Sequence, residues 1–231
     1  MKKYEWKNPF RELNKFEWGL WLSSLIVVSL AFLLSPDKDY LSLLASLIGV
    51  TALIFVAKGM VFGQILCVIF AVFYGIVSFY FSYYGELITF LGMSAPIALF
   101  SVISWLKHPF KQSKEVEVNK VSSKQWLGLS VATLTVTCAF YFILRALGTA
   151  NLIISTISVT TSFAACYLSF LRSPYYAIGY AANDVVLIVL WVLAAIENIA
   201  YLPMIACFVA FLFNDGYGFY QWQKMKKRQH A

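Results

Sequence analysis

Charged residues are scarce in this chain of 231 residues, since Asp, Glu, Lys and Arg together make up only 13% of it. A typical soluble chain carries about 25%. Hydrophobic residues reach 61% and the mean hydropathy is +0.74, which is more apolar surface than one globular core can bury. The scarcity of charge excludes a soluble domain and predicts an all-α, polytopic membrane protein.

Histidines and closely spaced cysteines are also lacking. The two histidines lie in a polar linker (His108) and near the C-terminal end (His230). All four cysteines lie within apolar segments without a short pair spacing, which is typical of small buried thiols. We therefore expect no metal site, no disulfide and no cofactor. The four cysteines are Cys67, Cys138, Cys166 and Cys207.

Long apolar stretches are abundant. A helix needs about 20 apolar residues to cross the hydrocarbon core of a bilayer. The expected fold is therefore eight transmembrane helices joined by short turns, with one longer polar linker over residues 107–124. The expected spans cover residues 18–34, 40–57, 61–84, 87–105, 125–147, 150–171, 175–195 and 201–222.

Positive charges fall mainly on one side of these eight spans. Sixteen of the 18 Lys and Arg residues lie on one face, and only Lys38 and Arg145 lie on the other. The positive-inside rule then places both termini in the cytoplasm, in a cell inner membrane. The net charge of +7 is suited to anionic lipid, so no nucleic-acid partner is expected. Six of the seven tryptophans, Trp105 and Trp222 among them, fall near span ends, where the headgroup level is expected.

The order of the spans suggests an internal repeat. Spans two to four and six to eight each have a basic joint, at Lys58 or Arg172, and each end on a tryptophan. One connector helix between them would give both units the same orientation, and transporter sites commonly lie between such halves. The expected segments are an N-terminus with the first helix (1–39), a first three-helix bundle (40–106), a linker and connector helix (107–149), a second bundle (150–222) and a basic tail (223–231).

Polar residues within the spans are candidates for a binding site. An Asp at the centre of a transmembrane helix costs about 2.5–3.5 kcal/mol on insertion scales. Asp184 lies near the middle of the seventh span and shares one helical side with three other polar or aromatic residues. The candidate substrate-binding residues are Tyr180, Asn183, Asp184, Trp191, Gln64, Tyr74, Asn214 and Asp215.

The residue types in this set limit the ligand. No Lys or Arg falls at mid-membrane, so a phosphorylated ligand is not expected. Acids, amides and aromatic faces suit a flat, polar, neutral or cationic molecule. Glu86 and Glu197 fall at the outer joints, where we expect them to be solvated.

Several motifs resemble the PnuC-type vitamin transporters in their order along the chain. AKG at residues 57–59, YGE at 84–86, Pro96 and Trp105 resemble the first half of that family; NDVVLIVLW at 183–191 and NDGYGFYQW at 214–222 resemble the second. The resemblance implies uptake of nicotinamide riboside, the ribosylated form of vitamin B3, through a three-plus-one-plus-three fold related to SWEET and semiSWEET proteins. It also implies facilitated diffusion, with trapping of the product by a cytoplasmic nicotinamide riboside kinase. The other expected partners are the lipid bilayer and further copies of the same chain, which we expect to form a trimer.

The chain departs from the family in its binding helix. That helix typically carries two tryptophans three residues apart, followed by Asn or Asp three residues later. The matching positions here are Ala177, Tyr180 and Asn183. A different cationic or ring-containing vitamin, such as thiamine, therefore stays open as the substrate.

Two further alternatives concern mechanism. An ion-coupled carrier would use titration of Asp184 or Asp215. An intramembrane enzyme would use the same two residues as a catalytic pair, but no nucleophile–base motif or phosphate-cradling glycine loop accompanies them. We expect that the chain is not an enzyme.

Overall fold

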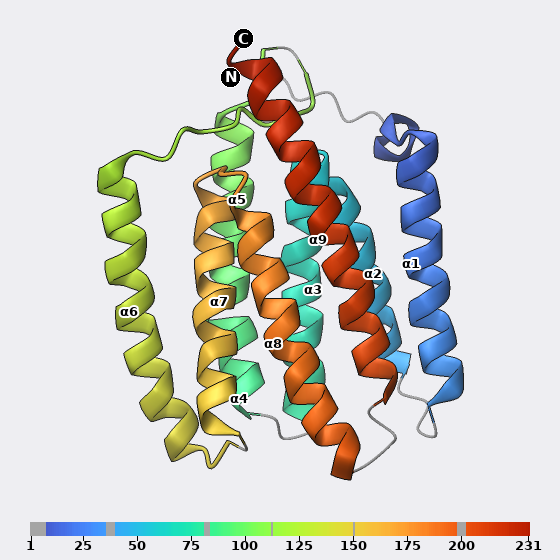
Figure 1. Cartoon of the computed structure of the whole chain (residues 1–231), viewed down its shortest axis with the longest axis vertical. Helices are drawn as coiled ribbons and strands as arrows, with labels where there is room; N and C mark the ends of the chain where they lie inside the picture. The colour runs from blue at the N-terminus through green and yellow to red at the C-terminus, as the bar shows by residue number, and fades with distance from the viewer. Residues whose placement is uncertain (1–7, 36–39, 81–83, 112, 150, 198–201) are drawn as a thin grey trace.

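The computed structural model describes residues 8–35, 40–80, 84–111, 113–149, 151–197 and 202–231, which form a bundle of roughly aligned helices (Figure 1). The prediction of an all-helical chain is confirmed over these residues. The helices are η1 (Pro9–Glu12), α1 (Lys15–Leu34), α2 (Tyr40–Ala57), α3 (Val61–Tyr80), α4 (Tyr84–Leu87), η2 (Ile88–Ser94), α5 (Ala95–Lys107), α6 (Ser123–Ala146), α7 (Leu152–Phe170), α8 (Tyr176–Glu197) and α9 (Leu202–Gln229).

Five stretches in the described part of the chain are long and apolar enough to cross a membrane: Lys15–Leu34, Gly85–Lys107, Ser123–Ala146, Leu152–Phe170 and Tyr176–Ile196. Leu43–Ala57 and Val61–Ile76 are apolar but shorter. Lys2, Lys3, Lys7 and Lys38, which were counted for the orientation, lie outside the described residues.

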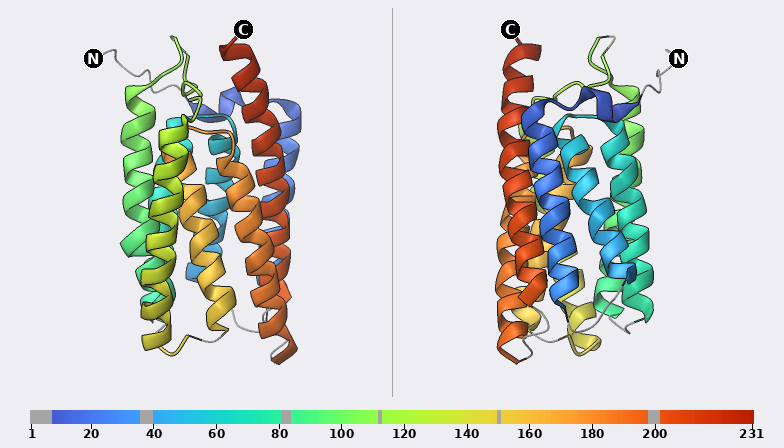
Figure 2. Two further views of the ribbon diagram at one scale, coloured as in Figure 1. Left: turned by 60° about the vertical axis from the view of Figure 1, so that its left-hand side comes forward. Right: turned by 90° about the vertical axis from the view of Figure 1, so that its right-hand side faces the viewer.

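Most of the helices pack as two groups, each built of three consecutive helical stretches. The first group holds α2, α3 and the α4–η2–α5 stretch, and the second holds α7, α8 and α9. Between the groups, α2 packs against α9 and α5 packs against α7. The first helix of each group therefore packs against the last helix of the other. The remaining helices are peripheral: α6 packs against α7, and α1 packs against α2 and α9 (Figure 2).

The turns within the two groups are built alike. Gly59, between α2 and α3, and Arg172, between α7 and α8, have positive φ angles of 66° and 57°. The Gly59 N–H donates to Val56 O at 2.9 Å, and the Arg172 N–H donates to Ser169 O at the same distance. These left-handed residues end α2 and α7 with the same backbone geometry. The positive φ costs little conformational energy for glycine and more for arginine.

Close helix contacts also recur. A Cβ atom on Gly63 would lie 2.4 Å from the Val56 backbone nitrogen, and one on Gly179 would lie 2.9 Å from Ala165 Cα. Both distances are shorter than real contacts. Each group therefore needs a glycine where its second helix approaches its first.

The stretch that ends the first group is not uniformly α-helical. In η2 the backbone widens to a π-helix directly before Pro96, and the Ala95 N–H donates to Phe90 O. Pro96 has no N–H and its ring clashes with an α-helical carbonyl four residues earlier, which a wider turn relieves. Thr89, Phe90 and Ser94 are turned toward the interior by this segment.

Residues near the ends of the spans have protein partners that the sequence did not indicate. Trp105 and Trp222 are fully buried between the two helix groups, so their indoles pack against protein and not against lipid. Lys58 does not act as a free anchoring charge, because its Nζ lies 3.0 and 2.9 Å from the two carboxylate oxygens of the buried Glu17. Glu17 also accepts a hydrogen bond from the Tyr217 hydroxyl at 2.8 Å, which ties α1 to the α2–α3 joint and to α9.

Residues 108–111 and 113–122, the start of α1 and the end of α9 gather at one end of the bundle, which we call the linker end (Figure 1). The helix α9 continues through the basic tail to Gln229.

Candidate substrate cavity

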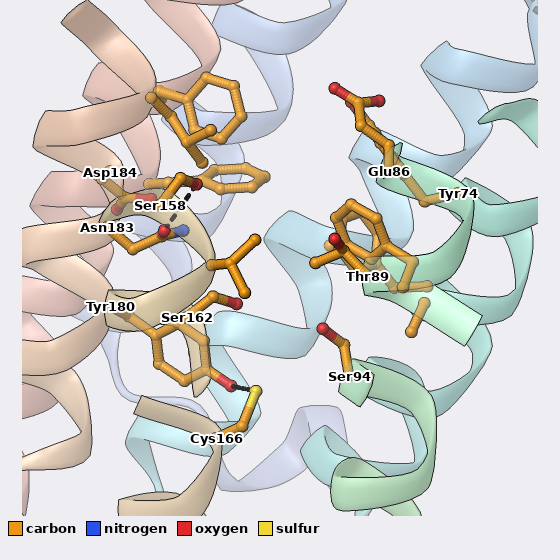
Figure 3. A pocket seen from close by; sticks show the side chains of 18 of the residues that line it. Tyr74, Glu86, Thr89, Ser94, Ser158, Ser162, Cys166, Tyr180, Asn183 and Asp184 are labelled. Carbon is orange, nitrogen blue, oxygen red and sulfur yellow. Dashed lines mark hydrogen bonds between the residues drawn. The ribbon is translucent and has the colours of Figure 1, made fainter. Parts of the chain in front are cut away.

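A cavity of about 260 Å³ lies between the two helix groups. Its size is near the lower end of small-molecule sites, which occupy about 300–1,000 Å³. Side chains reach it from both groups, through α2, α3, α4, η2, α7, α8 and α9, and from α6 through Leu144. Figure 3 shows two facing walls, one with Tyr74, Glu86 and Thr89 and the other with Tyr180, Asn183 and Asp184.

Seven of the eight residues predicted from the sequence line this cavity. They are Gln64, Tyr74, Tyr180, Asn183, Asp184, Trp191 and Asp215. Asn214 is the exception. Its Nδ2 donates to Ser24 Oγ and to Ala210 O, both at 2.8 Å, so it joins α9 to α1 outside the cavity.

Asn183 is held by two hydroxyl groups of α7. Ser158 Oγ lies 3.1 Å and Thr161 Oγ1 lies 3.0 Å from Asn183 Oδ1, and both hydroxyls are placed to donate to it. The Ser158 contact is visible in Figure 3. These contacts fix one end of the carboxamide on α7 and leave its other end directed to the cavity.

The carboxyl groups of Asp184 and Asp215 lie within hydrogen-bonding reach of each other where α8 packs against α9. Each residue is only 4% exposed. Asp184 Oδ2 is buried without a hydrogen-bond partner among the described residues. No Lys, Arg or His belongs to the described cavity lining, so nothing basic offsets this pair. A positively charged ligand group would be stabilised here by both carboxyl groups.

Two polar contacts lie on the part of the cavity lining nearest the linker end. One joins the two helix groups, and the other lies within the second group. Gln64 on α3 donates from Nε2 to Ser169 Oγ on α7 at 2.8 Å. The Tyr180 hydroxyl lies 3.2 Å from Cys166 Sγ. The Tyr180 ring therefore lies along the wall with its polar end fixed.

Aromatic rings cover much of the remaining lining. Tyr74 lies with its ring centroid 4.4 Å from that of Phe90 and 5.7 Å from that of Phe70. Trp191 lies on the opposite group, on α8. Such faces offer stacking and cation–π contact to a flat ligand.

Sequence reasoning missed Glu86. It was expected to be solvated at an outer joint, but it is half-buried and lines the cavity. The motif YGE could have indicated this, because a carboxylate directly before a long apolar stretch is costly unless it faces a polar space. Glu197 has a side chain outside the described set.

No cluster of three or more His, Cys, Asp or Glu side chains suited to a metal ion occurs among the described residues. The cavity thus combines acids, amides and aromatic rings. A helical bundle of apolar spans with such a cavity between two similar groups is typical of a membrane transporter.

Comparisons with known proteins agree with this class. A family model described as "Nicotinamide mononucleotide transporter" matches residues 39–224, and the chain belongs to that family. Two similar relatives are both named "Nicotinamide riboside transporter PnuC". The one from Neisseria mucosa is 28% identical over 230 residues, covering 96% of this chain and 87% of the relative. The one from Haemophilus influenzae is 26% identical over 212 residues, covering 90% of each.

A solved structure described as "Crystal structure of the Vitamin B3 transporter PnuC" is also similar. It has a TM-score of 0.78 and 27% sequence identity, and the match covers 94% of both chains. The chain is therefore a multi-pass membrane transporter and not an enzyme.

Proposed function

We propose that the protein carries nicotinamide riboside across the membrane and binds it in the cavity between the two helix groups. The names of its relatives support the substrate. The single observation that carries the proposal is the charge of the cavity: Glu86, Asp184 and Asp215 line it without any basic residue among the described lining. Nicotinamide riboside is a cation without a phosphate group, so it matches this lining.

The same charge argues against the mononucleotide as substrate, although the family description names it. A phosphate group needs cationic partners, usually Arg or Lys. The cavity would instead place its carboxyl groups near that phosphate. The lining therefore favours the nucleoside over the phosphorylated form as the proposed substrate.

The proposed roles of the residues follow from their chemistry. Asp184 and Asp215 balance the positive ring, and Asn183 and Gln64 hydrogen-bond the polar edges. The rings of Tyr74, Tyr180 and Trp191 provide faces for stacking. Ala177 has no ring and does not line the cavity, so we assign stacking on this part of α8 to Tyr180.

The proposed architecture has eight spans, with α1 followed by three-plus-one-plus-three helices as in SWEET proteins. The reciprocal packing of α2 on α9 and α5 on α7 supports two units in the same orientation. We propose that these units rock to expose the site alternately, with both termini in the cytoplasm of an inner membrane. Transport would be facilitated diffusion, with trapping by a cytoplasmic nicotinamide riboside kinase, and the assembly a trimer.

Uptake into proteoliposomes tests the substrate directly. Labelled nicotinamide riboside should enter with saturable kinetics, unlabelled riboside should compete, and the mononucleotide should not. Saturable uptake of thiamine with no flux of the riboside would contradict the assignment and move it to the alternative vitamin.

The adjacent buried carboxyl groups of Asp184 and Asp215 favour one second candidate, an ion-coupled carrier. The same proteoliposomes distinguish the two. With the membrane potential held at zero, facilitated diffusion of this cation predicts that an imposed proton or sodium gradient leaves the final internal concentration equal to the external one. Accumulation above that concentration would establish coupling.

A further inference from the structure

The linker end of the cavity is closed by contacts that cross between the helix groups. We infer that the indoles of Trp105 and Trp222, together with the linker segment 115–119, form the inner gate of the transporter. This inference rests on the proposed transport function, because a gate has a role only where the site must open to that side.

Each indole holds the opposite helix group. Trp105, at the end of the first group, donates from Nε1 to Ser169 O of α7 at 3.0 Å. Trp222, in the last helix of the second group, donates from Nε1 to Val56 O of α2 at 2.9 Å. The two ring centroids lie 5.3 Å apart, and both residues are fully buried. The indoles thus cross over each other between the groups.

The two acceptors occupy equivalent positions. Val56 O also accepts the N–H of Gly59, and Ser169 O also accepts the N–H of Arg172, each in the left-handed turn that ends a first helix. The last helix of each group is therefore fastened to the end of the first helix of the other group, in both cases from an indole Nε1 to a main-chain carbonyl oxygen. This reciprocity is what a closed state of two equivalent rocking units requires.

The crossed indoles directly adjoin the cavity. They belong to an apolar cluster with Val56, which itself lines the cavity. Cys67 and Tyr180 pack against the cluster and also line the cavity. A solute leaving the cavity toward the linker end must therefore pass between Trp105 and Trp222.

The linker segment covers this cluster on its outer side. Val116 and Val118 are each 1% exposed and insert into the cluster. The Val116 N–H donates to Gly59 O at 2.9 Å in the first group, and the Asn119 N–H donates to Arg172 O at 3.1 Å in the second. One short segment thus bridges both turns.

The end of α9 holds the segment in place. Gln229 accepts from the Val118 N–H at 2.7 Å and donates to Val116 O at 3.1 Å. Arg228 forms an ion pair with Glu115. Separation of the two groups at this end therefore requires the segment to release at least one turn.

The test uses Cys67 of the native chain as a reporter, since it lines the cavity just inside the gate. Vesicles are prepared in both orientations, which are established with a tag at the C-terminus. A cationic, membrane-impermeant methanethiosulfonate reagent is applied, and modification of Cys67 is quantified by mass spectrometry. Trp105→Phe and Trp222→Phe keep an aromatic ring but remove the hydrogen-bond donor.

Each Trp→Phe variant should raise the rate of Cys67 modification from the linker side about two- to tenfold, the range expected for one lost hydrogen bond. The rate from the other side should not rise. Gln229→Ala, near the chain end and outside the cavity, should act in the same direction. Trp126→Phe, on a half-exposed tryptophan of α6, is the matched control and should leave both rates unchanged.

Unchanged modification from the linker side in Trp105→Phe, Trp222→Phe and Gln229→Ala would overturn the gate. Should a tryptophan variant fail to fold, Gln229→Ala alone decides the question. Failure of the proposed function looks different: the wild type would then show neither uptake of nicotinamide riboside nor protection of Cys67 by it, whatever the variants do.

Discussion

At the residue scale, the cavity is defined by carboxyl groups without basic partners. Asp184 and Asp215 are 4% exposed and Glu86 stands on the facing wall. Removing a carboxylate from water inside a bilayer is unfavourable, so its position needs a compensating interaction. In the proposed function a cationic ligand supplies that interaction for part of each transport cycle.

Asp184→Asn tests this role. The amide keeps the shape of the side chain but removes the charge, so the affinity for nicotinamide riboside should fall about 10- to 100-fold, as for a lost hydrogen bond to a charged group. Isothermal titration with purified protein measures the change. Glu12→Gln, which removes one negative charge from an exposed side chain of η1, is the matched control and should bind as wild type does. Equal affinity of Asp184→Asn and wild type would make Asp184 a helix-packing residue.

At the element scale, the two helix groups repeat the same solutions for joining and packing helices. Gly59 and Arg172 end the first helices in left-handed turns, and Gly63 and Gly179 allow the second helices to approach them. The π-helical η2 before Pro96 has no counterpart among the described helices of the second group. The π-helix places Thr89, Phe90 and Ser94 in the cavity lining, so the first group contributes a different lining from the second.

Gly63→Ala should separate α2 from α3, because the new Cβ would lie 2.4 Å from a backbone nitrogen that cannot move independently. A loss of about 1–3 kcal/mol is expected, as for other overpacked cores. Thermal unfolding of the purified protein in detergent should show this loss of stability as a lower Tm. Gly216→Ala on α9 is the control, since nothing lies within 4 Å of its Cβ position, and its Tm should stay level or rise. A Gly63→Ala variant as stable as Gly216→Ala would show that the contact is not close in solution.

At the scale of the whole molecule, two groups meet around a cavity and α1 and α6 stand outside them. The ligand would contact both groups, so its binding should stabilise the whole bundle. The negative charge of the cavity predicts that cationic compounds without a phosphate group stabilise the bundle.

A thermal-shift panel measures that preference. Nicotinamide riboside at 100 times its Kd should add about 2.7 kcal/mol, or roughly 5–10 °C in Tm. Nicotinamide mononucleotide at the same concentration should give no shift, because its phosphate meets carboxyl groups. A larger shift with the mononucleotide than with the riboside would contradict the proposed substrate class. Thiamine in the same panel distinguishes the alternative vitamin.

Sequence alone determined the helices and most of the candidate site. Apolar runs of span length are a local property, so the helix positions followed directly. Polar residues are so costly within such runs that Asp184, Asn183, Gln64 and Asp215 could be singled out, and the structure places these four around one cavity.

Only the tertiary structure decided which polar group faces which neighbour. Asn214 and Asp215 are adjacent in sequence, yet one contacts Ser24 on α1 and the other the cavity, because successive residues of a helix point in different directions. Trp105 and Trp222 looked like interfacial anchors, but their partners, Ser169 O and Val56 O, lie 64 and 166 residues away. Helical periodicity carries no information on such distant contacts, so the crossed tryptophans could be found only once the two groups were packed together.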